Sequence, residues 1–235
     1  MQGSYRRTFL GPFWITAQQL LWVLGIGVVY SQLFHVERST FIPLLSYGVL
    51  IWQFIMGSVT TAPSLFVNAS SYLSSSNLPL TFYAFQSLAD QVITFAHTAA
   101  VMIIIPIIYG SGPTAWAAVY VPIALLLIVT NGAACMLWLA PLGARYRDVR
   151  VAISATTQLL MFMTPVFWDP QQLTGRHWIV MSNPLAWPVL SFRDPLLGRP
   201  ADSTVWALFA IATVVNCVLG FVVFSRTRRQ IRYWL

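Results

Sequence analysis

Apolar residues dominate this chain in six long runs, and the segments between the runs hold most of its charges. A helix that crosses a bilayer needs about 20 mostly apolar residues, and each run is close to that length. The pattern therefore predicts an all-α membrane protein, a single domain over residues 1–235 with six transmembrane helices. The predicted spans are residues 12–34, 41–66, 82–109, 115–142, 151–168 and 205–224.

Composition supports a membrane protein. Hydrophobic residues make up 57% of the chain and charged residues only 8%, whereas a soluble domain carries about 25% charged residues. The outer surface must therefore face lipid. The net charge of +7 could suggest nucleic acid, but the arginines lie at the ends of apolar runs and indicate membrane topology instead. Cys135 and Cys217 lie inside apolar runs without ligand-type neighbours, so we expect no metal site.

The arginines also predict the orientation in the membrane. With six spans, both termini lie on the same side, and positively charged residues stay on the cytoplasmic side. Four arginines fall on the opposite side: Arg38, Arg176, Arg193 and Arg199. Nine fall on the side of the termini, which is therefore predicted to be cytoplasmic: Arg6, Arg7, Arg145, Arg147, Arg150, Arg226, Arg228, Arg229 and Arg232.

Two cytoplasmic loops follow from this topology. Residues 143–150 gather Arg145, Arg147, Asp148 and Arg150 between the fourth and fifth spans, which predicts a surface loop. Asp148 is placed to cap the start of the fifth span, near the positive end of its helix dipole. The arginines either contact a partner or only fix the topology. Residues 67–81 carry no charge, and their serines and asparagines suit caps and turns, so we expect a short surface helix that ends near Pro79.

The external segment, residues 169–204, is the longest stretch outside the spans. Residues 178–192 within it are mostly apolar, but they are too few to span and are broken by Pro184 and Pro188. This pattern predicts a re-entrant or interfacial element. Trp168, Trp178 and Trp187 suit the level of the lipid headgroups.

Polar residues inside the spans are the candidates for a translocation path. Asp90, the only acidic residue inside a span, shares one helix face with Gln86, Thr94 and His97 because they are spaced three or four residues apart. Buried polar groups in membranes either line a wet path or form hydrogen bonds between helices, and both interpretations stay open. The predicted path residues are Gln53, Gln86, Asp90, Thr94, His97, Asn131 and Gln158, and the first span adds Gln18 and Gln19 as polar positions.

Motifs of catalysis are absent from the sequence. It contains no Gly-x-Ser-x-Gly, no His-Glu-x-x-His and no closely paired carboxylates. It also contains no lysine, so it cannot build a phosphate-binding P-loop. The chain is therefore not expected to be an enzyme or to bind a cofactor, and another subunit would supply the energy for transport. An intramembrane enzyme using Asp90 and His97 and a passive scaffold are the alternatives outside transport.

A series of short motifs in a fixed order resembles the ABC-2 permeases that export polysaccharides, the Wzm-type exporters of O-antigen, teichoic acid and galactan. The resemblance covers nearly the whole chain. Its motifs are Tyr5-Arg6-Arg7 and the following residues to Trp14, Asn77-Leu78-Pro79-Leu80, Phe95-Ala96-His97, residues 143–148, Thr164-Pro165-Val166, Asn183-Pro184, residues 193–198 and residues 228–235.

The resemblance implies a homodimer in the bacterial inner or plasma membrane, with two ATPase subunits that bind ATP and Mg²⁺, and a lipid-linked glycan as substrate. The alternative is a permease for a drug or another small amphipathic molecule. The implied ATPase-coupling residues are Asn77, Leu78, Pro79, Arg145, Tyr146, Arg147 and Asp148. The external segment would form a gate that includes Trp168, Asn183, Pro184 and Arg193, and Arg6 and Arg7 would attract the pyrophosphate of the carrier lipid.

Two departures from the family pattern concern the cytoplasmic side. Family members usually carry an amphipathic interfacial helix before the Arg-Arg element, whereas Arg6 and Arg7 lie at the start of this sequence. We therefore expect that helix to be truncated or missing here. The first coupling loop, residues 67–81, lacks the basic residue that the family pattern leads us to expect.

Overall fold

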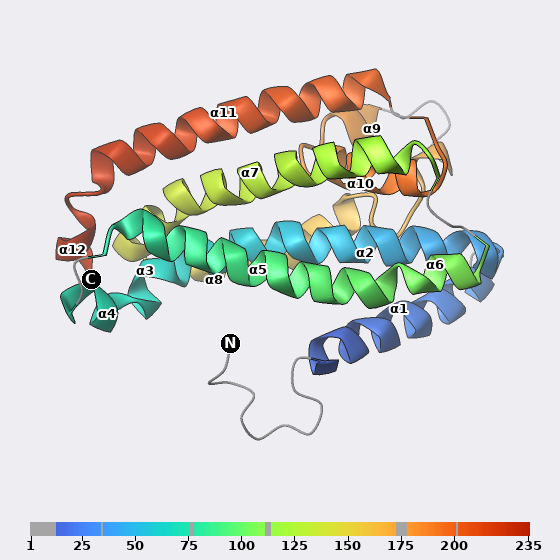
Figure 1. Ribbon diagram of the computed structural model, residues 1–235, viewed down its shortest axis with the longest axis horizontal. Helices are drawn as coiled ribbons and strands as arrows, with labels where there is room; N and C mark the ends of the chain where they lie inside the picture. The colour runs from blue at the N-terminus through green and yellow to red at the C-terminus, as the bar shows by residue number, and fades with distance from the viewer. Residues whose placement is uncertain (1–12, 34, 76–77, 111–113, 173–177, 201) are drawn as a thin grey trace.

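A computed structural model of the chain describes residues 13–33, 35–75, 78–110, 114–172, 178–200 and 202–235. Within these ranges the regular structure is helical and includes no strand (Figure 1), so the predicted all-α class is confirmed. The longer helices are α1 (Phe13–Leu33), α2 (Arg38–Thr61), α5 (Leu80–Met102), α7 (Ala117–Arg145), α8 (Asp148–Met163), α10 (Ala186–Leu196) and α11 (Ser203–Thr227). The short ones are η1 (Ala62–Ser64), α3 (Leu65–Asn68), α4 (Ser70–Ser75), α6 (Ile104–Ile108), η2 (Pro170–Gln172), α9 (Trp178–Met181) and α12 (Ile231–Trp234).

Each of the six predicted spans contains a helix. Four stretches of the described chain are long and apolar enough to cross a membrane, namely Arg38–Asn68, Leu80–Ile108, Ala117–Arg145 and Ser203–Thr227. They correspond to the second, third, fourth and sixth predicted spans. The first and fifth correspond to α1, with 21 residues, and α8, with 16. That these two helices also cross the membrane stays a prediction.

Helix α2 forms the centre of the molecule, and α11 lies at its edge. In the most apolar window of each stretch, 78% of the residues are buried for α2 and its extension, against 17% for α11. A helix that is apolar all round is buried by its neighbours or faces lipid. In α2 the neighbours are α1, α5, α7, α8 and α10. In α11 one side packs along α7, as Figure 1 shows, and most of the remaining surface is exposed on the described chain.

A close backbone contact fixes the end of α7. At Gly143 a Cβ atom would lie 2.1 Å from the carbonyl oxygen of Pro63 in η1, so only glycine permits this crossing. Small residues at helix crossings allow such close approach inside membranes. As a result, the segment after α2 and the segment after α7 are held together at one end of the bundle.

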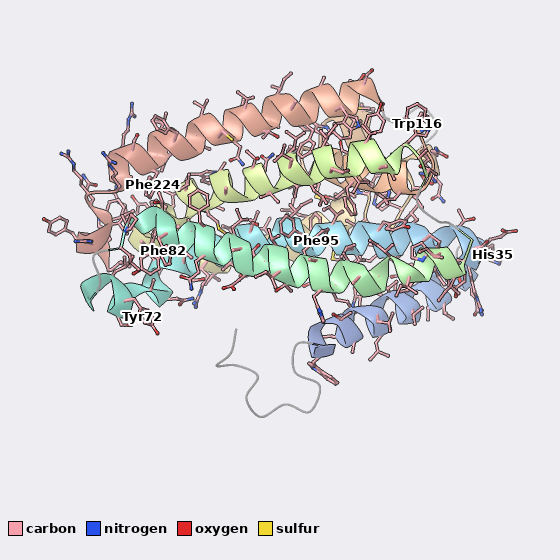
Figure 2. The ribbon with its side chains drawn as sticks, in the orientation of Figure 1. His35, Tyr72, Phe82, Phe95, Trp116 and Phe224 are labelled. Atoms are coloured by element: carbon pink, nitrogen blue, oxygen red, sulfur yellow. The ribbon has the colours of Figure 1, made fainter. Side chains whose placement is uncertain are left out.

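The two ends of the bundle differ. Helices α3, α4 and α12 gather at one end, beside the start of α5 and the end of α11 (Figure 1). The labelled side chains of Tyr72, Phe82 and Phe224 lie at this end, and those of His35 and Trp116 lie at the other (Figure 2). The predicted short surface helix is confirmed as α4, although it ends at Ser75 rather than beside Pro79. Pro79 instead directly precedes α5, where a missing N–H costs nothing.

Candidate functional site: a polar pocket and two surface loops

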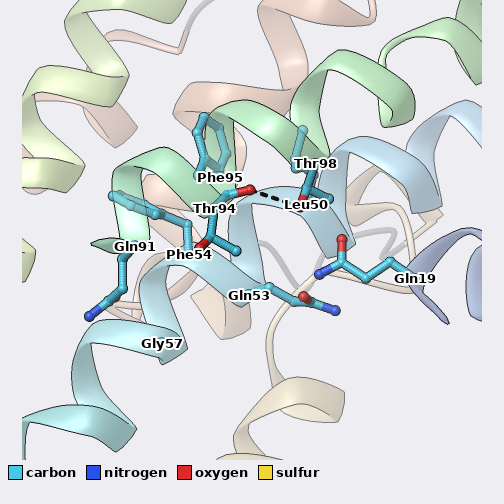
Figure 3. A pocket seen from close by; sticks show the side chains of 9 residues that line it. All are labelled: Gln19, Leu50, Gln53, Phe54, Gly57, Gln91, Thr94, Phe95 and Thr98. Atoms are coloured by element: carbon cyan, nitrogen blue, oxygen red, sulfur yellow. Dashed lines mark hydrogen bonds between the residues drawn. The ribbon is translucent and has the colours of Figure 1, made fainter. Parts of the chain in front are cut away.

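A polar pocket lies between α1, α2 and α5, in the part of the bundle that the sequence predicts to be within the membrane. It has a volume of about 150 Å³. Figure 3 shows Gln19 of α1, Gln53 of α2 and Gln91 of α5 extending side-chain amides around it. The remaining lining residues are Leu50, Phe54, Gly57, Thr94, Phe95 and Thr98. Three amides in an apolar bundle form an unusual concentration of hydrogen-bonding groups.

Two of these amide atoms are buried and have no hydrogen-bond partner within the described chain. Gln91 Oε1 accepts a hydrogen bond of 2.9 Å from Ser58 Oγ, but the buried Nε2 of Gln91 has no acceptor, and the buried Oε1 of Gln19 has no donor. A buried polar atom without a partner costs about 1–3 kcal/mol. Thr98 Oγ1 is satisfied, since it donates to the carbonyl oxygen of Thr94 at 2.9 Å. The pocket therefore offers both a donor and an acceptor to a polar molecule.

A second recess continues from the first. It has a volume of about 300 Å³ and lies between α1, α2 and α8. It shares Gln19 and Gln53 with the first pocket and adds Gln18, Trp22 and Met161. Because Trp22 contributes an aromatic surface beside these amides, the combined recess offers hydrogen-bonding groups and an apolar surface to the same molecule.

Two predicted path residues, Gln53 and Thr94, line this recess. Gln86 and Asp90 are exposed on α5, and Gln158 is exposed on α8. His97 is partly buried on α5 but lines neither of the two recesses. Of the predicted path residues on α5, only Thr94 borders the pocket, and whether Gln86, Asp90 and His97 line a path stays a prediction. The face that lines the pocket carries Gln91, Thr94, Phe95 and Thr98.

Gln91 was not among the predicted path residues, and Gln19 was identified only as a polar position. The signal for Gln91 is its spacing, because positions i, i+3, i+4 and i+7 bring it to the same face as Thr94, Phe95 and Thr98. Asp90 is exposed on the described chain, whereas the amide of the adjacent Gln91 borders the pocket.

Asn131, another predicted path residue, belongs to a hydrogen-bond network between α7 and α11. Its Nδ2 donates to Thr213 Oγ1 at 2.6 Å, and its Oδ1 accepts from Asn216 Nδ2 at 3.0 Å. Asn216 Oδ1 in turn accepts from Trp138 Nε1 at 2.8 Å. In this structure Asn131 therefore forms hydrogen bonds between two helices, which is one of the two roles, path lining or interhelical bonding, that the sequence left open.

The charged loop between α7 and α8 lies at the surface as predicted. Arg145, Tyr146, Arg147 and Asp148 are all exposed, and none of them takes part in the ion pairs found among the described residues. The Arg145 guanidinium lies 5.1 Å from the ring centre of Tyr146 and 5.4 Å from that of Trp234 in α12. The C-terminal tail therefore supports this loop through cation–π contacts.

The capping role predicted for Asp148 is wrong. The N-cap of α8 is Arg147, and no side-chain hydrogen bond caps this end. Asp148 is instead the first residue of the helix, one position too late for its carboxylate to accept from the N–H groups that a cap serves. Its charge still lies in the first turn, where it favours the helix dipole.

The first loop lies at the same end of the bundle, where Leu78 and Pro79 are exposed just before α5. Its third predicted coupling residue, Asn77, lies outside the described residues, as do Arg6 and Arg7. The close contact of Gly143 with Pro63 brings together the end of α7 and the segment that follows α2.

The predicted gate residues hold a folded corner that follows α8. Asn183 Nδ2 donates to the carbonyl oxygen of Met163 and to Thr164 Oγ1, each at 3.2 Å. Arg193, which has 0% exposure, donates through Nη1 to the carbonyl oxygen of Pro165. Trp168 Nε1 donates to the carbonyl oxygen of Phe162 at 3.1 Å. Pro184 stays exposed and borders an apolar cavity beside α7 and α11.

Electrostatics reinforce this corner. Arg199 Nη1 lies 2.9 Å from Asp169 Oδ1, and its Nη2 bonds the other carboxylate oxygen, so the pair is bidentate. Burial acts to raise the pKa of Asp169, but the hydrogen bonds and charge of Arg199 outweigh it and hold this pKa below its ordinary value. Burial lowers the pKa of Arg193, although Asp194, whose Oδ1 lies 3.4 Å from Arg193 Nε, partly offsets that effect.

The sequence was also compared with known proteins. The family model for the ABC-2 type transporter matches residues 1–197. Two proteins of Klebsiella pneumoniae, each named O-antigen export system permease protein RfbA, are 20% identical to the chain over 231 residues, which is 97% of this chain and 88% of each relative. The family model covers well over half of the chain, and the helical, strongly apolar fold agrees with it. The chain belongs to the ABC-2 type transporter family of membrane proteins.

Proposed function

We propose that this chain is the permease subunit of an ATP-driven exporter that moves a lipid-linked polysaccharide across the plasma or inner membrane. The observation that carries the proposal is the match, over 97% of this chain, to proteins named as O-antigen export permeases. Similarity of this extent includes the loops and the external segment as well as the apolar spans, where composition alone could produce matches.

The recess between α1, α2, α5 and α8 supports a sugar as the transported group. Gln19 and Gln91 each present a buried atom that lacks a hydrogen-bond partner in the described chain, and Gln53 and Trp22 border the same space. Amides suit sugar hydroxyls because they both donate and accept. In our proposal, two copies of the chain face each other and join their recesses into one path.

The energy comes from a separate ATPase in this proposal. The chain contains no lysine with which to build a P-loop. The exposed side chains of Arg145, Arg147 and Asp148 form a charged surface without ion pairs in the described chain. Such a surface suits docking to a partner that presents acidic groups to the arginines and a basic group to the aspartate. Leu78 and Pro79 add an apolar contact beside it. Two ATPase subunits would bind there on the cytoplasmic side, where both termini also lie.

Two further assignments complete the proposal. Arg6 and Arg7 attract the pyrophosphate of the carrier lipid at the cytoplasmic interface. The external segment, with Trp168, Asn183, Pro184 and Arg193, forms the gate through which the glycan leaves. Arg193 and Asn183 support this role by tying the segment to the end of α8, so that motion of α8 moves the segment with it.

The substrate class is tested by reconstituting the chain with its ATPase partner in proteoliposomes. We expect a lipid-linked glycan to raise the rate of ATP hydrolysis and to become accessible on the far side of the membrane. Stimulation by small amphipathic molecules without stimulation by the glycan would favour the drug permease instead and refute the proposed substrate.

The docking surface is tested by reversing the charge of Asp148. The Asp148→Lys variant should lose co-purification with the ATPase and lose export, whereas a matched reversal at exposed Glu37, Glu37→Lys, should keep both. Cysteine labelling of the loop confirms that topology is unchanged in each variant. Normal co-purification and export in the Asp148→Lys protein would show that the loop only sets topology.

A further inference from the structure

A basic cleft lies where α11 ends, apart from the recess and from the charged loop between α7 and α8. Its volume is about 590 Å³. Three arginines from the end of the chain line one side, and four residues around the start of α5 line the other. The full lining is Leu78, Pro79, Leu80, Thr81, Phe224, Arg228, Arg229 and Arg232. Figure 1 shows these two segments, far apart in the sequence, meeting at the same end of the bundle.

The three arginines of this basic cleft lack a counter-charge in the described structure. The ion pairs found there join Arg193 with Asp194 and Arg199 with Asp169, so the cleft arginines take part in neither. None of the lining residues is acidic. Three guanidinium groups around one space repel each other, and an anion placed between them relieves that repulsion. Guanidinium groups match phosphate oxygens in geometry as well as in charge.

An apolar stripe on α11 leads directly to the cleft. Val214, Val218 and Phe221 are exposed, Phe221 by 73%, and they follow the helical spacing of three to four residues that continues to Phe224 and Arg228. Few residues of this helix are covered by the rest of the chain. A ligand for the stripe and the cleft together therefore has a long apolar part and an anionic head, which is the chemistry of an acidic phospholipid.

We propose that the basic cleft binds the phosphate of an anionic phospholipid whose acyl chains lie along Val214, Val218 and Phe221. Arginines near a membrane surface attract acidic lipid, and the cleft concentrates three of them on one headgroup. Because Leu78 and Leu80 form the opposite wall, the bound lipid braces the first cytoplasmic loop against α11. The site is independent of which substrate the transporter carries.

Native mass spectrometry of the purified full-length chain tests this site. We expect phosphatidylglycerol to stay bound to the wild-type chain at collision energies that remove phosphatidylcholine, and millimolar glycerol phosphate not to displace it. The Arg228→Gln/Arg232→Gln variant should bind phosphatidylglycerol at least about tenfold more weakly. The matched control, Arg226→Gln/Arg150→Gln, removes the same charge from exposed arginines outside the cleft and should bind like wild type.

Several results would overturn the proposal. Equal loss of lipid in both double variants would show general attraction of positive charge and no built site. Retention of phosphatidylcholine as strong as that of phosphatidylglycerol, or displacement by glycerol phosphate, would exclude an anionic phospholipid. If the Arg228→Gln/Arg232→Gln variant loses co-purification with the ATPase but binds lipid as the wild type does, the cleft is a protein docking site instead. Arg228→Lys/Arg232→Lys keeps the charges and should restore most of the binding if the double glutamine variant folds poorly.

Discussion

Replacing Gly143 by alanine tests the contact that joins α7 to the end of α2. The new Cβ would lie 2.1 Å from the carbonyl oxygen of Pro63 and 2.4 Å from its Cα. Ordinary contact begins at 3.4 Å, so the two backbones must separate by about 1.3 Å, the difference between 3.4 and 2.1 Å. The atoms that clash belong to backbone, and no side chain can rotate away to make room.

The expected cost follows from two opposing effects. Overpacking a well-packed contact costs about 1–3 kcal/mol, and occasionally more, and a clash with backbone belongs at the upper end. Alanine in place of glycine inside a helix returns about 1 kcal/mol through its better helix propensity. We therefore expect Gly143→Ala to lower the free energy of unfolding by about 2 kcal/mol.

The measurement is unfolding in mixed micelles, followed by the fluorescence of the 10 tryptophans. Gly25→Ala is the matched control, because Gly25 lies inside α1 and nothing lies within 4 Å of its added Cβ. This control should raise the free energy of unfolding by about 0.5–1 kcal/mol. If Gly143→Ala is as stable as Gly25→Ala, the close crossing at Pro63 is wrong.

Three further predictions concern hydrogen bonds and charge. Asp169 has a pKa lowered below its ordinary 3.8 by Arg199, so the pair stabilises the fold above about pH 4 and this contribution is lost as the pH falls below that value. The stability difference between wild type and Asp169→Asn should therefore shrink between pH 5 and pH 3. Asn216→Leu removes the acceptor of Trp138 Nε1 and should cost about 1–2 kcal/mol in the same micelle assay, since such bonds average about 0.6 kcal/mol each. Gln91→Leu should leave stability within about 1 kcal/mol, because it also removes an unpaired buried donor, yet it should reduce ATP hydrolysis stimulated by a lipid-linked glycan.

The apolar runs were sufficient to predict the helices because the length and hydrophobicity of a span are set by the bilayer. They were insufficient to predict which face of a helix turns inward. The third span shows the reason, since its charged residue Asp90 stays exposed while the neutral amide of Gln91 reaches the pocket. Which of two adjacent positions is buried depends on the helices packed around α5, and the sequence of α5 alone does not contain that arrangement.

Helix ends were also hard to place from the sequence. Asp148 was predicted to cap α8 but became its first residue, because Arg147 at the preceding position occupies the N-cap. The charge pattern identified the surface loop correctly, whereas the cap depends on the backbone angles of a single residue. Arg193 differed in another way. It was predicted only as an arginine of the external gate segment, and the fold shows that its guanidinium is fully buried against Pro165.

The brevity of α8 has a consequence for the surrounding bilayer. Its 16 residues make a helix about 24 Å long, whereas the hydrocarbon layer of a membrane is about 30 Å thick. The chain then continues as the buried, non-helical residues Thr164, Pro165 and Val166. The carbonyl oxygen of Pro165 accepts a hydrogen bond from the Arg193 guanidinium. Irregular backbone at membrane depth is tolerated where protein covers it in this way. On the topology that we propose, this hydrophobic mismatch thins the bilayer beside α8, and a polar group moving along that helix crosses a thinner hydrocarbon barrier than elsewhere in the membrane.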